Sequence, residues 1–86
     1  MYNYSRIRGK IKEIFGTQEA FSKAIGLSAT TISDKLNHKV EWTQKEMEKT
    51  MEVFGMPVRL IPLYFFCNET QELEKTANPT LSTFNN

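Results

Sequence analysis

The sequence predicts an all-α domain of five helices, and three observations lead to this fold class. Apolar residues recur three or four positions apart along much of the chain, which is the spacing of one helix face. Serine or threonine stands directly before four of these runs, where its side chain can cap a helix. Glycine stands directly after three of them, where helices commonly end. With 86 residues, the chain has the length of one small domain.

The first helix is expected at about residues 6–15, after Ser5 as its N-terminal cap and before Gly16 at its end. Gly9 weakens its first turn, because glycine inside a helix costs about 1 kcal/mol relative to alanine. The inward face of this helix is predicted to carry four apolar residues, Ile7, Ile11, Ile14 and Phe15.

The second helix is expected at about residues 18–25, capped by Thr17 and ended by Gly26. The third, at about residues 29–36, is capped by Ser28. The predicted inward residues are Phe21, Ala24 and Ile25 in the second helix and Ile32 and Leu36 in the third.

The fourth helix is expected at about residues 44–54. It begins with a capping box, in which Thr43 and Glu46 each satisfy a free backbone N–H of the other's turn. Gly55 ends this helix. Trp42, in the preceding loop, is predicted to close that loop onto the core, with stacking on a DNA sugar or a partner as the alternative. The buried stripe of the helix is predicted to be Met47, Met51 and Phe54.

A short fifth helix is expected to begin at Pro57, and Pro62 is expected to interrupt the segment after it. The most apolar stretch of the chain lies here and allows two interpretations. It closes the core under the first helix, or it forms a dimer or partner interface, since exposed aromatic patches mark contacts. The residues concerned are Leu63, Tyr64, Phe65 and Phe66.

The domain is expected to span residues 1–67, and residues 68–86 are predicted to form a loose, polar, flexible tail rich in Asn and Thr. Residues 1–67 carry ten Lys and Arg against seven Asp and Glu, a net charge of +3. The tail carries one Lys and three Glu, a net charge of −2. Four bases near the start are interpreted either as a phosphate clamp or as a solvated helix face: Arg6, Arg8, Lys10 and Lys12.

Composition excludes several classes of protein. A single cysteine, Cys67, excludes an internal disulfide, and with a single histidine, His38, it argues against a zinc site. No metal and no cofactor are expected. The chain has no apolar run of membrane-spanning length and no signal-peptide pattern, so it is expected in the cytoplasm. No catalytic motif is present, and we do not expect an enzyme.

Two short helices joined by a tight glycine-containing turn have the geometry of a helix-turn-helix. Gly26 supplies the turn residue that tolerates positive φ. Small residues in the first of the two helices allow close packing between them: Ala20, Ser22 and Ala24.

Residues 17–37, from Thr17 to Asn37, resemble the helix-turn-helix of the Cro/C1-type phage regulators. Flanking residues are similar to a group of small phage proteins described as Cro-like repressors, and the resemblance covers about residues 3–67. It is carried there by residues 4–11, Lys35-Leu36-Asn37, Trp42-Thr43-Gln44 and Tyr64-Phe65-Phe66.

The resemblance implies a five-helix bundle that binds a double-stranded DNA operator, usually as a homodimer, in a bacterial host cell. The second helix of the motif would lie in the major groove. Carried over by position, phosphate contacts would come from Gln18 and Ser28, base contacts from Ala29, Thr30, Ser33 and Asp34, and further backbone contacts from Asn37 and Lys39.

This chain departs from the family pattern at the base-facing positions, which lack the Arg, Asn and Gln that make bidentate base contacts. Asp34 would also face the DNA phosphates. An apolar residue is common in the family where Lys35 stands, and Leu36 is expected to take its place in the core.

Two functions remain open. The favoured one is a sequence-specific DNA-binding regulator of a phage or prophage. The alternative is an antirepressor or modulator that binds another repressor's DNA-binding domain through the same fold.

Overall fold

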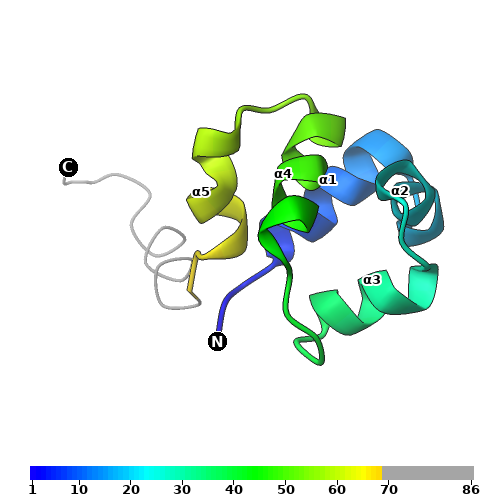
Figure 1. Cartoon of the computed structure of the whole chain (residues 1–86), viewed down its shortest axis with the longest axis horizontal. Coiled ribbons are helices and arrows are strands. Elements are labelled where there is room, and N and C mark those ends of the chain that lie inside the picture. Colours follow the sequence, from blue (N-terminus) through cyan, green and yellow to red (C-terminus); the bar gives the residue numbers. More distant parts are fainter. Residues whose placement is uncertain (69–86) are drawn as a thin grey trace, which may run out of the picture.

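Five α-helices joined by short connections make up the computed structural model of the chain, which describes residues 1–68 (Figure 1). The predicted ranges of the first four helices are confirmed to within one residue. In chain order the elements are α1 (Ser5–Phe15), α2 (Gln18–Ile25), α3 (Ala29–Leu36), α4 (Gln44–Phe54), the 3-10 turn η1 (Val58–Leu60) and α5 (Ile61–Phe65).

The caps between α1 and α3 agree with the sequence prediction. Thr17 Oγ1 accepts a hydrogen bond from the backbone N–H of Ala20 at 3.1 Å, and Ser28 Oγ accepts one from Thr31 at 3.0 Å. Gly26 ends α2 in the left-handed conformation, with φ of 81°, which a side chain would strain. The turn between α2 and α3 is therefore set by local chemistry on both sides.

Three predictions about where helices start or break are wrong. Ser5 is the first residue of α1 and not its cap; its backbone N–H donates to Asn3 Oδ1 at 2.8 Å, so Asn3 supplies the missing acceptor. Pro57 precedes η1 and does not start a helix, and Pro62 does not interrupt the chain. Pro62 lies in the first turn of α5, where a backbone N–H would have no acceptor within the helix, so the N–H that proline lacks is not missed.

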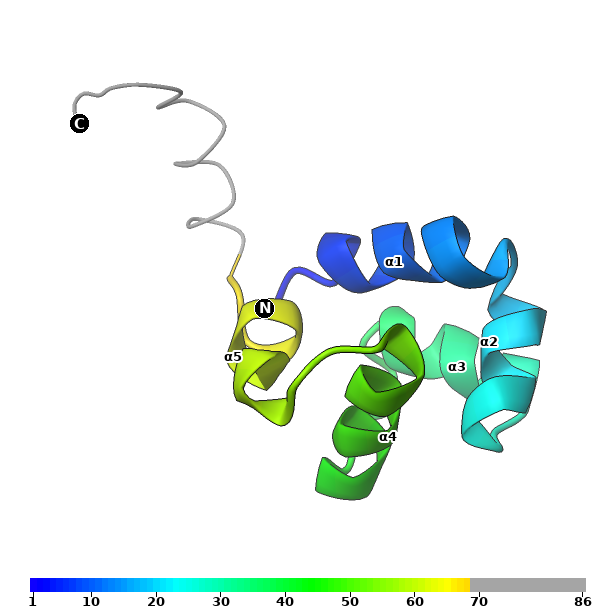
Figure 2. The ribbon, with the colours of Figure 1, turned by 90° about the horizontal axis from the view of Figure 1, so that it is seen from above.

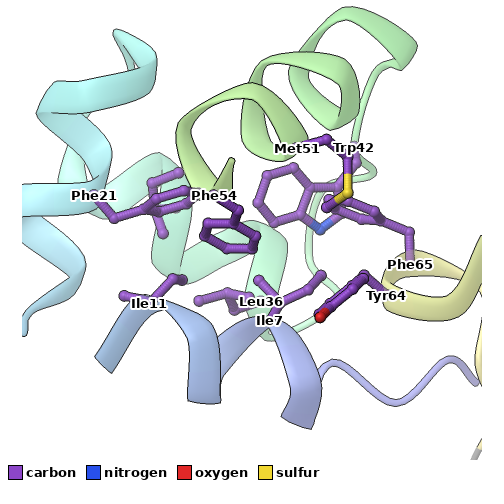
Figure 3. Packing of buried hydrophobic residues seen from close by; sticks show 10 residues of the cluster. Ile7, Ile11, Phe21, Leu36, Trp42, Met51, Phe54, Tyr64 and Phe65 are labelled. Carbon is purple, nitrogen blue, oxygen red and sulfur yellow. The ribbon is translucent and has the colours of Figure 1, made fainter. Parts of the chain in front are cut away.

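The buried core lies between α1, α3, α4 and α5 and is closed at one end by Phe21 of α2 (Figure 3). Of the residues predicted to face inward, Phe15, Ala24, Ile25 and Met47 are half-buried around this core, and Ile14 is exposed because it lies at the edge of the inward face of α1. The loop residue Trp42 is buried, as predicted. The core consists of Ile7, Ile11, Phe21, Ile32, Leu36, Trp42, Met51, Phe54, Tyr64 and Phe65.

The arrangement of the helices separates the end of the domain that carries α2 from the end that carries α5. α2 and α5 lie at opposite ends of the domain, and the N-terminus lies beside α5 (Figure 2). The backbone N–H of Asn3 donates to the carbonyl of Cys67 at 2.7 Å, which ties the N-terminal segment to the chain after α5. The predicted domain division after residue 67 and the predicted tail concern residues that lie almost entirely outside those described.

Candidate functional site

The outward face of α3 and its surroundings carry all eight residues predicted to contact DNA, and none of them is in the core. We name these eight residues, which lie on α3, beside its two ends and at the start of α2, the α3 face. Ser28, Ala29, Thr30, Asn37 and Lys39 are exposed, and Gln18, Ser33 and Asp34 are partly exposed.

Several polar side chains of the α3 face are bonded to one another. Ser28 Oγ donates to Thr31 Oγ1 at 2.8 Å while it caps the helix. At the other end, Asn37 Nδ2 donates to Ser33 Oγ at 3.3 Å. A ligand that recruits Ser28, Ser33 or Asn37 therefore has to compete with an internal hydrogen bond.

Arg8 reaches from α1 to the C-terminal end of α3. Its Nη2 donates to the carbonyl of Leu36 and to Asn37 Oδ1, both at 3.1 Å. A cation at this end favours the helix because the last carbonyls carry partial negative charge. Lys10 likewise pairs with Glu13 at 3.2 Å. Arg8 therefore has a structural role at the site, which the sequence interpretation of a phosphate clamp or a solvated face did not foresee.

The end of α3 takes a defined shape without glycine. His38 adopts a positive φ of 65°, and its ring stacks on Tyr4 with centroids 4.7 Å apart. The backbone N–H of Lys39 donates to the carbonyl of Asp34 at 2.8 Å, and that of His38 donates to the carbonyl of Lys35 at 3.2 Å. This pair of bonds is a Schellman motif, which holds Lys39 close to the end of the helix.

Lys35 is buried, with 4% of its surface exposed, and sequence reasoning missed this role. Its Nζ pairs with Glu46 Oε1 at 2.9 Å, donates to the carbonyl of Glu41 at 2.8 Å and lies 5.9 Å from the ring centre of Trp42. Leu36 is buried as well, as expected. The ion pair joins α3 to the start of α4, and no sequence signal links the two residues because their pairing depends on how the helices pack.

Glu46 serves two partners with one oxygen, since Oε1 also accepts from the backbone N–H of Thr43 at 2.9 Å and completes the predicted capping box. Partial burial alone would raise the pKa of the Glu46 carboxyl. The Thr43 N–H and the Lys35 ammonium group outweigh that effect and hold the pKa below its ordinary value. Glu46 is therefore held in its charged form opposite Lys35.

The charge that α3 presents to solvent depends on this ion pair. The helix carries two charged side chains, Asp34 and Lys35. Because Lys35 is buried against Glu46, Asp34 is the charged side chain that remains accessible. The outward charge of α3 is therefore negative, and the helix offers no cation to a DNA phosphate.

The C-terminal apolar stretch divides between the two predicted roles. Tyr64 and Phe65 are buried in the core, with 8% and 1% of their surfaces exposed. Leu63 and Phe66 are 37% and 42% exposed. Phe66 packs edge-on against Tyr2, with ring centroids 5.3 Å apart. An interface role stays a prediction, and the side chains accessible for it are Leu63 and Phe66.

Within residues 1–68, no three His, Cys, Asp or Glu side chains lie close enough together to hold a metal ion. The same part of the chain has no helix with the length and apolar character needed to cross a membrane.

Comparison with known proteins gives one family and one informative structure. Residues 1–69 match the family described as "Protein of unknown function (DUF739)". The chain is similar to the solution structure of the modulator of repression (MOR) of the temperate bacteriophage TP901-1 from Lactococcus lactis, with 48% sequence identity and a TM-score of 0.67. The similarity covers 76% of this chain and 88% of that chain. No curated protein matches.

Proposed function

The chain belongs to the DUF739 family, and we propose that it modulates repression in a temperate phage by binding the DNA-binding domain of the phage repressor. The observation that carries this proposal is the 48% identity to a phage modulator of repression. Because the similarity spans most of both chains, it concerns the whole helical domain and not one motif alone.

The charge that the helix α3 itself presents to solvent supports a protein partner over direct DNA binding. A helix in the major groove lies between two rows of phosphates, and Asp34 would be repelled by them. The DNA-binding surface of a repressor is basic, and an outward acidic group complements it. Ala29 and Thr30 at the start of α3 add small, exposed side chains that allow close approach of another protein.

Direct DNA binding is the second candidate, and the helix-turn-helix geometry of α2 and α3 favours it. Ala29 and Thr30 stand exposed at the start of the second helix, where such motifs contact base edges, and Lys39 is exposed beyond its end. Phosphate contacts would dominate this mode because few side chains of the α3 face read bases. A homodimer would place two such helices about 34 Å apart on successive major grooves.

A charge reversal distinguishes the two candidates. Asp34→Lys should weaken binding to the purified DNA-binding domain of the repressor encoded by the same phage by about tenfold or more, measured by isothermal titration calorimetry. The same variant should increase retention of random duplex DNA at low salt. Glu48→Lys is the matched control, since it makes the same charge change on α4, outside the α3 face, at an exposed residue.

Unchanged repressor affinity in Asp34→Lys would remove the α3 face from the proposed interface. No binding of the wild-type chain to the repressor domain would overturn the proposal itself. A selection from random duplexes that enriches a two-fold motif with half-sites about ten base pairs apart would establish the second candidate instead.

A further inference from the structure

An apolar groove of about 440 Å³ lies between the N-terminal segment, the α3–α4 connection and α5, and it is lined by none of the eight residues of the α3 face. Its lining includes four large apolar side chains that are strongly exposed. These are Met1, Tyr2, Val40 and Phe66, with 82%, 45%, 47% and 42% of their surfaces exposed. Apolar surface gathered in this way marks a contact site on a small protein.

The walls of the groove are held in place by the fold. Trp42 and Phe65 meet edge-to-face with ring centroids 5.0 Å apart and form its buried side. The N-terminal side is tied down by the backbone bridge between Tyr2 and Asn68. The groove is therefore preformed, which lowers the entropic cost of filling it.

One wall also carries an unsatisfied polar group. Trp42 is 6% exposed, and its indole Nε1–H has no hydrogen-bond partner within residues 1–68. Buried N–H donors are nearly always paired in folded proteins. This nitrogen has almost no exposed surface of its own, so Trp42 offers the groove its apolar ring and not a hydrogen-bond donor.

The chain itself continues from the edge of this groove. Asn68 is the last described residue and is bridged to Tyr2, a lining residue, and residues 69–86 come after it. Their composition falls into two parts. Residues 69–75 contain all four charged groups of this segment, and residues 76–86 contain none but include Leu81 and Phe84.

The distance is compatible with docking in the same molecule. Leu81 lies thirteen residues after Asn68, and thirteen residues of polypeptide can bridge any distance up to about 43 Å. Asn68 is bridged to Tyr2, which lines the groove, so residues 69–80 have only a short distance to cover between Asn68 and a docked Leu81. Tethering of this kind gives an effective concentration in the millimolar range, which is enough for a weak apolar contact.

We propose that Leu81 and Phe84 dock in the groove beside Trp42, so that the C-terminal segment of the chain covers its own apolar surface. The inference stands apart from the proposed function, because it uses neither the α3 face nor a repressor. A partner that binds the groove would have to displace this segment.

Trp42 is the only tryptophan of the chain and reports on the groove directly. In the full-length protein, Leu81→Ser combined with Phe84→Ser should shift the indole N–H resonance of Trp42 in the nitrogen–proton correlation spectrum. The amide resonances of Tyr2, Val40 and Phe66 should shift with it. Leu73→Ser is the matched control, since it makes the same kind of change in the charged part of the segment and should leave these resonances in place.

A reciprocal variant tests the other side of the contact. Val40→Ser changes an exposed lining residue outside the core, so the fold is retained. It should increase the fast backbone motion of residues 80–85, measured by heteronuclear relaxation in the full chain. The proposal is overturned if the Leu81→Ser, Phe84→Ser variant leaves the Trp42 resonance in place and Val40→Ser leaves the backbone motion of residues 80–85 unchanged. It is also overturned if the Trp42 shift depends on protein concentration over a tenfold range, since a second copy of the chain would then be the occupant.

Discussion

Lys35→Met tests whether the buried ion pair holds α3 in place. The substitution removes an ammonium group with 4% of its side chain exposed and leaves Glu46 Oε1, which is 2.9 Å away, without its cation. Breaking a buried pair by removing one partner costs about 3–5 kcal/mol. Methionine retains most of the apolar length of lysine, so the cavity contributes little to this cost.

The cost here should be smaller, at about 2–3 kcal/mol, because the surviving charge is not fully stranded. The Glu46 side chain is 20% exposed and keeps the hydrogen bond from the Thr43 N–H. Solvent and this bond both stabilise the unpaired carboxylate. Glu46→Gln should cost at least as much, because the Lys35 ammonium group that it leaves without a counter-ion is only 4% exposed.

Urea unfolding followed by helical circular dichroism measures these effects. With a slope of about 1 kcal/mol/M for a domain of this size, Lys35→Met should lower the urea midpoint by about 2–3 M. The double variant Lys35→Met with Glu46→Gln should cost no more than either single variant, a coupling free energy of about 2 kcal/mol.

Lys49→Met is the matched control for Lys35→Met. Lys49 pairs with Glu52 at 3.7 Å, but the side chains are 46% and 71% exposed, so the loss should stay below about 0.5 kcal/mol. The reasoning is refuted if Lys35→Met shifts the midpoint no more than Lys49→Met, or if the two single effects of the pair simply add.

Two further predictions concern the same helix and its anchor. Arg8→Met removes both hydrogen bonds that Arg8 donates at the end of α3 and should lower the free energy of unfolding by about 1 kcal/mol. Hydrogen exchange at the amides of Asn37 and His38 should become faster. A uniform change in exchange over all helices, or an equal effect from Lys12→Met at an exposed residue, would contradict a local anchoring role. Because the pKa of folded Glu46 lies below its ordinary value of 4.5, its contribution to stability is complete above that pH and is lost as the pH falls through the lower, folded value. Urea midpoints measured across this range should therefore fall less in Glu46→Gln than in the wild type, and equal falls would argue against the shift.

Helices and their ends depend on residues a few positions apart, and for that reason the sequence alone predicted most of them. The capping box of Thr43 and Glu46 joins residues three positions apart, and the caps by Thr17 and Ser28 reach equally short distances. The turn at Gly26 likewise needs only the freedom of one residue to adopt positive φ. The surface position of the residues predicted to contact DNA is set by the same local periodicity.

The same local reasoning was wrong where two acceptors compete or where a helix edge is involved. Asn3 and Ser5 both suit a cap, and nothing in their spacing shows that Asn3 receives the hydrogen bond. Ile14 continues the apolar spacing of α1 yet is exposed, because it lies at the edge of the inward face of that helix.

Tertiary structure alone decided the chemistry of the α3 face. Lys35 and Glu46 are eleven residues apart, and Arg8 and Asn37 are twenty-nine apart, so their pairing depends on how separate helices pack. Packing also divided one apolar stretch, burying Tyr64 and Phe65 and exposing Leu63 and Phe66. The sequence by itself thus determined where the helices lie, because that depends on nearby residues. The fold determined which charges reach the surface, because burial depends on residues brought together from distant parts of the chain.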